Sequence, residues 1–328
     1  MRWCGRVAAV CALALAASAG AQTPSTGAGQ AYPTRTMRLV VAFPSGGGVD
    51  ILARTLALKV GTSLGQQMIV DNRPGANGNI GGEFVARAPA DGYTLLLVVS
   101  SFATNPHVYA KQSFDLLSDF APVTLLTSAP LVLVAHPALP VKSVQELIAL
   151  AKARPGELNS SVAGLGSGGQ LALELFKSMA RVDIVTVPYK GGVAAITDTI
   201  GGQVQLTINN PLALLPHVKT GKLRALGTSS LQRLVAAPEI PTIAEAGLPG
   251  YEATLWYGIV LPAKAAPALI ARLNTEFVQA VQQPDVRERM NGEGVLIIGS
   301  TPEQFAEHLR RESAKWGKVI RDAKIKLD

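Results

Sequence analysis

The sequence contains little cysteine, few aromatic residues and little charge, and each shortage excludes a class of function. Only two of its 328 residues are cysteines, Cys4 and Cys11, and both lie close to the N-terminus. The rest of the chain therefore offers no thiol for a disulfide, a covalent nucleophile or a thiolate metal site. Aromatic residues make up 5% and charged residues 16%, which is typical of a compact α/β protein with buried strands rather than a disordered chain.

The sequence also lacks a second long apolar run and a dense basic stripe. An apolar run from Val7 to Ala17 is too short to anchor the chain across a bilayer, and no other segment approaches about 18 apolar residues. The formal net charge is +7, but the basic residues are scattered, with a modest cluster from Lys315 to Lys326. Nucleic-acid binding requires a concentrated basic surface. We therefore expect neither a membrane helix nor a nucleic-acid partner.

The N-terminal run has the features of a secretory signal. Arg2 and Arg6 precede it, and small residues follow it through Ala21, as expected for a cleaved signal peptide. We assign residues 1–21 to this signal, with cleavage near Ala19 to Ala21, and the small, polar residues 22–35 to a flexible lead-in. Cleavage lowers the formal charge from +7 to +5 and removes both cysteines. The mature protein is expected to be exported from the cytoplasm.

One pattern occurs twice: an apolar strand, a glycine-rich loop and an amphipathic helix. The two copies are LVVAFPSGGGVDILARTLA at 39–57 and LNSSVAGLGSGGQLALELF at 158–176. A helix N-terminus carries unpaired N–H groups and the positive end of the helix dipole, so it attracts anions. Glycine lets a ligand approach the backbone closely. The repeat predicts two similar lobes that close around a small carboxylate.

Strands and helices alternate along the chain, which predicts an α/β fold with a mainly parallel sheet in each lobe. We assign residues 36–127 and 253–328 to lobe 1 and residues 128–252 to lobe 2, with strands that cross between the lobes near 123–135 and 254–261. Ligands of such sheets bind outside the carboxyl ends of the strands. The loops expected there are 43–50, 100–105, 164–169, 188–192 and 209–211.

Other interpretations of these motifs exist. Gly164 to Gly169 matches the dinucleotide pattern G-x-G-x-x-G, but the acidic residue that should end the next strand is absent, because Asp183 falls near its start. Carboxylate binding is favoured, and a tight structural turn is the alternative. Asp50 either stabilises the first turn of its helix or meets a cationic group of an amphoteric ligand.

Catalytic and metal-binding interpretations find little support. A secreted hydrolase would use Ser45 or Ser167, yet Phe43 and Leu165 replace the first glycine that a G-x-S-x-G nucleophile elbow needs. The histidines are isolated and lack metal-ligand spacing. They are His107, His136, His217 and His308. We expect no enzyme activity, no cofactor and no metal.

Several segments resemble the extracytoplasmic receptors of tripartite tricarboxylate transporters, also called Bug proteins. They run in family order along the mature chain and include FPSGGGVDILAR (43–54), DNRPGANGNIG (71–81), PADGYTLL (89–96), VPYKGG (187–192), GKLRALGTSS (221–230), PEIPTIAEAG (238–247) and TPEQFAEHL (301–309). Three residues depart from the family pattern: Ser45 replaces a usual proline, Val49 a usual threonine and Gln205 a common aspartate. The resemblance implies a two-lobed periplasmic binding fold, type II-like, with a hinge of crossing strands.

The resemblance also implies a function. A carboxylate ligand would be held by backbone amides and bridging waters of the loops and delivered by a monomeric receptor to membrane permease subunits, or in some members presented to a signalling protein. The family accepts dicarboxylates, tricarboxylates, aromatic acids and amino acids. The residues expected to contact the ligand are Phe43, Ser45, Gly46, Gly47, Ser101, Asn105, Gly164, Gly166, Ser167, Gly168, Tyr189, Lys190, Gly191, Asn209 and Trp256.

Overall fold

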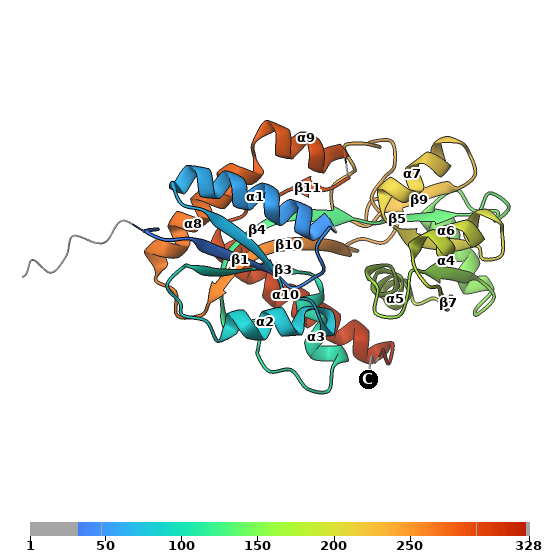
Figure 1. Cartoon of the computed structure of the whole chain (residues 1–328). Coiled ribbons are helices and arrows are strands. Elements are labelled where there is room, and N and C mark those ends of the chain that lie inside the picture. The colour runs from blue at the N-terminus through green and yellow to red at the C-terminus, as the bar shows by residue number, and fades with distance from the viewer. Residues whose placement is uncertain (1–31, 47, 293, 326–328) are drawn as a thin grey trace, which may run out of the picture.

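The computed structural model describes residues 32–46, 48–292 and 294–325, and these form two lobes side by side (Figure 1). Lobe 1 is built on a six-stranded sheet in the order β11-β4-β10-β3-β1-β2, and lobe 2 on a five-stranded sheet in the order β7-β6-β8-β5-β9. The expected two-lobed α/β fold is therefore confirmed. The predicted signal peptide, residues 1–21, lies outside the described residues, as does most of the lead-in.

The elements of lobe 1 come from both ends of the chain. Its strands are β1 (Met37–Val41), β2 (Met68–Asn72), β3 (Thr94–Val99), β4 (Phe120–Pro130), β10 (Thr254–Pro262) and β11 (Leu296–Ile297). Its helices are α1 (Gly48–Leu64), α2 (Asn79–Ala86), α3 (Ser101–Val108), α8 (Pro267–Val281), α9 (Pro284–Gly292) and α10 (Pro302–Asp322), with a short 3₁₀ turn at Ala76–Gly78.

Lobe 2 uses the middle of the chain. Its strands are β5 (Val132–Ala135), β6 (Asn159–Val162), β7 (Val185–Pro188), β8 (Leu206–Asn209) and β9 (Arg224–Thr228). Its helices are α4 (Val144–Ala153), α5 (Gly168–Ala180), α6 (Gly192–Ile200) and α7 (Pro211–Lys219). Among the helices of the described residues, none has both the length and the apolar character required to cross a bilayer.

The cores form where apolar stripes meet the sheets. β3 is apolar from Leu95 to Val99 and buried throughout, as expected for a strand covered on both faces. Leu52, Leu56 and Val60 repeat at the spacing of one helix face and are at most 1% exposed, because this stripe of α1 packs on the sheet.

The sheets are mixed rather than mainly parallel. β1 runs parallel to β2 and β3, whereas β10 runs antiparallel to both β3 and β4. In lobe 2, β5 is likewise antiparallel to β8 and β9. The reason is that the chain leaves lobe 1 along β4 and returns along β10, so neighbouring strands at each crossing run in opposite directions.

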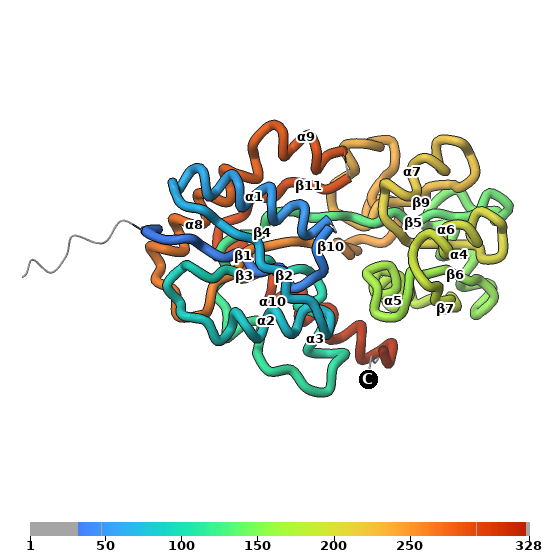
Figure 2. The backbone as a smooth tube through the Cα atoms, in the orientation of Figure 1, coloured from blue at the N-terminus to red at the C-terminus, as the bar shows by residue number. Residues whose placement is uncertain are grey.

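The chain crosses between the lobes after β4 and again before β10 (Figure 2). Ser229, at the end of β9, joins the two crossings. Its hydroxyl donates to Ala253 O at 2.6 Å and accepts from Leu131 N at 2.8 Å. Its backbone N–H donates to Leu131 O and its carbonyl accepts from Ala253 N. The two crossing segments are thus tied to one residue.

Two local expectations were wrong. Residues 100–105 were expected to form a loop, but helix α3 begins directly after Ser100 and continues to Val108 with Pro106 inside it. The end of the lead-in is also not loose. Tyr32 donates its hydroxyl to Gly92 O at 2.7 Å, and Thr34 N donates to Tyr93 Oη at 2.9 Å, so this short segment is held against lobe 1.

Candidate functional site

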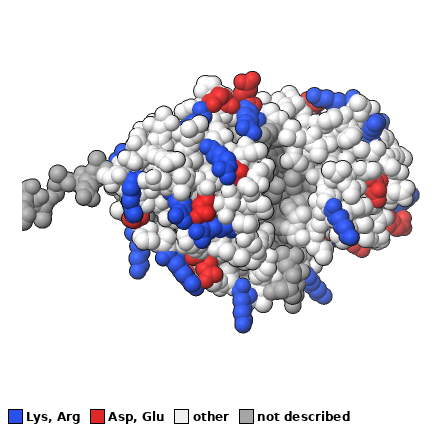
Figure 3. Space-filling view, viewed as in Figure 1, with Lys and Arg blue, Asp and Glu red and all other residues white. Residues whose placement is uncertain are grey.

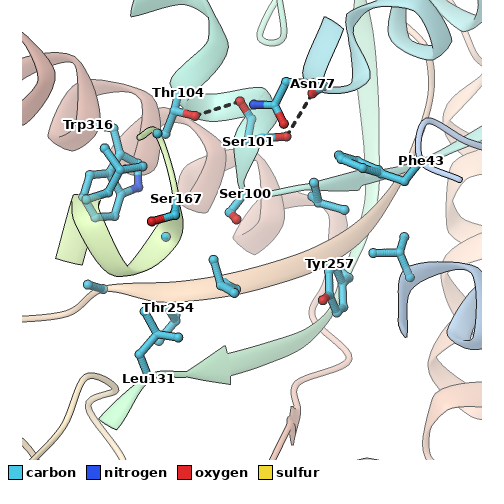
Figure 4. A pocket seen from close by; sticks show the side chains of 17 residues that line it. Phe43, Asn77, Ser100, Ser101, Thr104, Leu131, Ser167, Thr254, Tyr257 and Trp316 are labelled. Atoms are coloured by element: carbon cyan, nitrogen blue, oxygen red, sulfur yellow. Dashed lines mark hydrogen bonds between the residues drawn. The ribbon is translucent and has the colours of Figure 1, made fainter. Parts of the chain in front are cut away.

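A cavity of about 270 Å³ lies between the lobes and takes its walls from both. A strand of the crossing, β10, contributes Leu255 and Tyr257. The complete lining is Phe43, Val49, Asn77, Val99, Ser100, Ser101, Thr104, Leu131, Gly166, Ser167, Gly168, Leu171, Ala253, Thr254, Leu255, Tyr257 and Trp316 (Figure 4). None of these residues is charged at neutral pH. Figure 3 shows the hollow between the lobes, with mostly uncharged walls in this view.

Three helices begin at this cavity. Val49 of α1, Ser101 of α3 and Gly168 of α5 all belong to a first helical turn and all line the wall. The first N–H groups of a helix have no intrahelical partner and carry the positive end of its dipole. The site therefore attracts an anion through neutral groups supplied by both lobes. The doubled strand–loop–helix pattern predicted two of these three helix starts.

The two glycine loops are held by the same kind of hydrogen bond. Gly46 N donates to Asp50 Oδ2 at 2.9 Å, and Gly166 N donates to Gln170 Oε1 at 2.6 Å. In each case the accepting side chain lies four residues later, in the first turn of the helix. Both side chains are buried, with Asp50 3% and Gln170 6% exposed. These two amide groups are therefore occupied by the protein itself.

Asp50 acts on its own loop and not on the cavity. Its carboxylate also accepts from Arg54 Nε and from Asn72 Nδ2, each at 2.9 Å, and Asn72 Nδ2 donates to Phe43 O at 3.1 Å. The hydrogen bond from Arg54, with those from Gly46 and Asn72, lowers the pKa of Asp50 to about 2. Of the two interpretations of this residue, the geometry supports stabilisation of the helix start and its loop.

Side chains with hydroxyl and amide groups line the cavity along the top of Figure 4. Ser101 Oγ donates to Asn77 O at 3.2 Å, and Thr104 Oγ1 donates to Ser101 O at 3.0 Å. Asn77 in turn donates Nδ2 to Asn105 Oδ1 at 2.9 Å. On the opposite lobe Ser167 caps α5, and its hydroxyl oxygen accepts from Gln170 N at 3.2 Å.

Trp256 was expected to line the cavity and does not. It is 0% exposed, and its indole N–H donates to Glu312 Oε2 at 3.0 Å. Successive residues of a strand point to opposite faces, so Leu255 and Tyr257 face the cavity while Trp256 faces the core of lobe 1. Sequence analysis missed Trp316, which lines the cavity and donates its indole N–H to the same Glu312 oxygen at 2.8 Å.

The structure brings together only part of the expected contact set. Phe43, Ser101, Gly166, Ser167 and Gly168 line the cavity. Gly47 lies outside the described residues. The expected residues that are described but do not line this cavity are Ser45, Gly46, Asn105, Gly164, Tyr189, Lys190, Gly191, Asn209 and Trp256.

Physical reasons separate several of these residues from the cavity. Asn105 is 0% exposed inside α3 and supports Asn77 from behind, with its Nδ2 donating to Asn77 O at 3.0 Å. Tyr189 donates its hydroxyl to Asp198 Oδ2 at 2.8 Å, and burial raises its pKa further than this contact does. Lys190 is exposed. Asn209 uses its Oδ1 to accept from Asn210 N at 2.8 Å.

Among the described residues that line the cavity, none is a general base that could activate Ser167. The lining holds neither a histidine nor an acidic residue, so the hydroxyl of Ser167 has no base beside it in the cavity. Within the described part of the chain, no three histidine, cysteine, aspartate or glutamate side chains gather in a way that could hold a metal ion.

His308 lies in the aromatic cluster behind the cavity. Its ring centroid is 5.2 Å from that of Trp256 and 6.4 Å from that of Phe305. Burial lowers the pKa of His308 to about 4, while the carboxylate of Glu312 works in the opposite direction. The folded protein therefore keeps this imidazole neutral, as its apolar surroundings require.

This shift makes stability depend on pH. Between pH 6.5 and 4 the unfolded chain binds a proton at His308 that the folded chain does not. The free energy of unfolding should therefore decrease as the pH is lowered through this window. The loss attributable to His308 should reach about 3 kcal/mol at pH 4 and level off just below that pH. Urea unfolding of the wild type and of His308→Leu at several pH values measures it. A slope equal in both proteins between pH 6.5 and 4 would contradict the assignment.

Comparison with known proteins places the chain among receptors. The model of the tripartite tricarboxylate transporter family receptor matches residues 52–325. Protein BugT of Bordetella pertussis is 38% identical over 313 residues, which cover 95% of each chain. A UPF0065 protein from the tcbD-tcbE intergenic region of Pseudomonas sp. is 37% identical, covering 88% of this chain and 87% of the relative.

Solved structures agree with this placement. A Rhodopseudomonas palustris protein solved with adipate is 38% identical and superposes with a TM-score of 0.70, covering 90% of this chain and all of that one. A TctC solute-binding protein from Polaromonas, solved without ligand, is 26% identical with a TM-score of 0.82, covering 89% and 99%. MatC from Rhodopseudomonas palustris with bound malate is 30% identical with a TM-score of 0.66, covering 88% and 100%. Together with the interlobe cavity, these matches show that the chain belongs to the tripartite tricarboxylate transporter receptor family.

Proposed function

We propose that this protein is a periplasmic receptor that captures a small organic carboxylate in the cavity between its lobes and delivers it to the permease subunits of a tripartite transporter. The observation that carries the proposal is the convergence of three helix N-termini, from both lobes, on a cavity without charged side chains. Such a site attracts an anion without a fixed counter-charge. Related structures hold adipate and malate, which supports a carboxylate as the ligand.

Capture works by a shift between open and closed lobes. A ligand that contacts both lobes favours the closed state by its differential affinity for that state. The arrangement described here superposes better on the unliganded Polaromonas protein than on the adipate-bound and malate-bound proteins, although the latter two are more similar in sequence. This order of the TM-scores supports an open state of the two lobes that can accept a ligand.

The partners and location follow from the same proposal. A receptor of this family works outside the cytoplasm. The predicted signal at residues 1–21 would export the protein to that location. The receptor would act as a monomer without a cofactor or a metal. Presentation of the liganded receptor to a membrane signalling protein is the alternative use of the same closed state. Neighbouring genes for large and small permease subunits would favour transport.

A thermal-shift screen of carboxylates tests the proposal. A ligand that binds only the folded state raises the free energy of unfolding by about 2.7 kcal/mol at one hundred times its dissociation constant, so at least one small carboxylate should raise the melting temperature by several degrees. The amide of the same acid, which has no charge, serves as the control and should leave the melting temperature unchanged. A screen in which no carboxylate shifts melting, or in which the amides act equally, would refute the receptor function.

A further inference from the structure

A buried carboxylate lies behind the wall of the cavity without being part of its lining. Glu312 of α10 is 4% exposed, and its Oε2 accepts the indole N–H of Trp256 at 3.0 Å and that of Trp316 at 2.8 Å. Its Oε1 forms an ion pair with Lys315 in the same helix. A buried ion pair is weak evidence for added stability. What its partners do is therefore the better guide to the role of Glu312.

Trp316 is the partner of Glu312 that faces the cavity. Its side chain is 3% exposed and belongs to the lining, and Figure 4 shows it at the same end of the cavity as Ser167. An indole has one N–H donor and no acceptor, and Glu312 occupies that donor. Trp316 therefore offers a ligand the surface of its ring, and the hydrogen bond to Glu312 fixes how that ring is turned.

Lys315 keeps the carboxylate in place. Its Nζ pairs with Glu312 and also donates to Glu252 O at 3.0 Å, just before the wall residues Ala253 and Thr254. The same Nζ lies 4.7 Å from the centroid of the Trp316 ring, within the range of a cation–π contact. The acceptor of the Trp316 N–H is thus anchored both to its own helix and to the segment that returns to lobe 1.

Trp256 provides an internal comparison. It donates to the same Oε2 of Glu312, but its side chain is fully buried in the core of lobe 1 and does not line the cavity. The two indoles share residue type and acceptor atom and differ in where their rings lie. An effect of Glu312 on ligand binding that acts through the cavity wall involves Trp316 alone, whereas a general loss of packing involves both tryptophans.

We propose that Glu312 is a positioning residue for ligand binding, because it sets the orientation of the Trp316 ring in the cavity wall. The inference rests on the proposed function and adds a residue that acts on the ligand without touching it. A wall that is already ordered reduces the entropy lost when the ligand binds. Loss of the carboxylate should therefore weaken binding even where the protein stays folded.

Calorimetry tests the proposal with whichever of adipate, malate, citrate, benzoate and glutamate binds the wild type most tightly. Trp316→Phe keeps an aromatic ring but has no N–H for Glu312, and it should weaken binding about tenfold. Trp256→Phe is the matched control, which removes the other N–H from the same oxygen and should leave the affinity within about threefold of the wild type. Equal affinities of the two tryptophan variants would overturn the proposal.

Glu312→Gln tests the carboxylate itself. An amide has one acceptor oxygen, so glutamine must turn its NH₂ group towards either the indole N–H groups or Lys315. This variant should weaken binding about tenfold in the wild type and in Trp256→Phe, but change it less than about threefold in Trp316→Phe, because the contact through which it acts is already absent there. An equal effect in all three backgrounds would show that Glu312 does not act through Trp316.

A spectroscopic readout reports the ring orientation directly. The chain has three tryptophans, and Trp3 lies in the predicted signal, so Trp256→Phe leaves Trp316 as the single tryptophan of the exported protein. A fixed indole gives a near-UV circular dichroism band that is lost when packing becomes variable. Adding Glu312→Gln should weaken this band, and an unchanged band would contradict the positioning role. If the glutamine variant does not fold, the comparison of the two tryptophan variants still decides, whereas binding of none of the acids by the wild type counts against the receptor function instead.

Discussion

Gly168→Leu should abolish carboxylate binding and leave the protein folded. Gly168 is the first residue of α5 and lines the cavity. A Cβ atom there would lie 2.5 Å from Leu255 Cδ2, which also lines the wall, so a leucine side chain must occupy the ligand space. The loss should exceed about a hundredfold in affinity, or about 2.7 kcal/mol. Calorimetry with the tightest carboxylate from the screen measures it.

The fold should survive because leucine is a better helix former than glycine, and Gly168 has no positive φ angle. Gly201→Leu is the matched control. Gly201 is exposed at the end of α6, and a Cβ there makes only ordinary contacts, at 3.5 Å from Thr197 O. It should bind ligand as the wild type does. Retention of affinity within about threefold by Gly168→Leu would place the ligand elsewhere.

Trp256→Ala should cause a large loss of stability. The side chain is 0% exposed, and its ring packs edge-on against Phe305 with centroids 5.9 Å apart. Truncation of a buried tryptophan costs about 4 kcal/mol through lost burial and the remaining cavity. It also removes one of the indole donors to the buried carboxylate of Glu312. Guanidinium unfolding should show a lower midpoint with a similar slope.

Trp256→Phe separates the two contributions. Phenylalanine keeps an aromatic ring against Phe305 but has no N–H for Glu312, so this variant should lose less stability than the alanine variant. The stability that this variant still loses, about 1 to 3 kcal/mol, reflects the missing hydrogen bond to a charged group together with the smaller ring. A loss below about 1 kcal/mol for Trp256→Ala would mean that Trp256 does not hold the core of lobe 1 together.

The fold and part of the cavity lining could be predicted from the sequence because both depend on local patterns. The glycine loops before α1 and α5 follow from a repeated strand–loop–helix pattern, and Ser167 and Gly168 lie where that pattern places them. The start of α3 was misread because Pro106, together with small polar residues before it, is typical of a loop. Tertiary packing instead buries Phe102, Ala103 and Asn105 and stabilises the helix.

The remaining wall of the site depends on contacts between distant segments. Trp316 comes from α10, far from every glycine loop in sequence, and no local pattern places it at the cavity. On β10 the choice between Trp256 and Tyr257 depends on which face of the strand meets the core. Successive side chains of a strand point to opposite faces, so Trp256 and Tyr257 must face different sides of the sheet. In an apolar strand packed on both sides, the sequence does not indicate which of the two side chains faces the cavity.

The bonds of Ser229 determine how the lobes can move. Because one side chain holds Leu131 and Ala253 together, the two crossing segments cannot slide past each other without breaking both hydrogen bonds. Relative motion of the lobes is therefore expected to bend both crossing segments together at Ser229 rather than to shift one along the other.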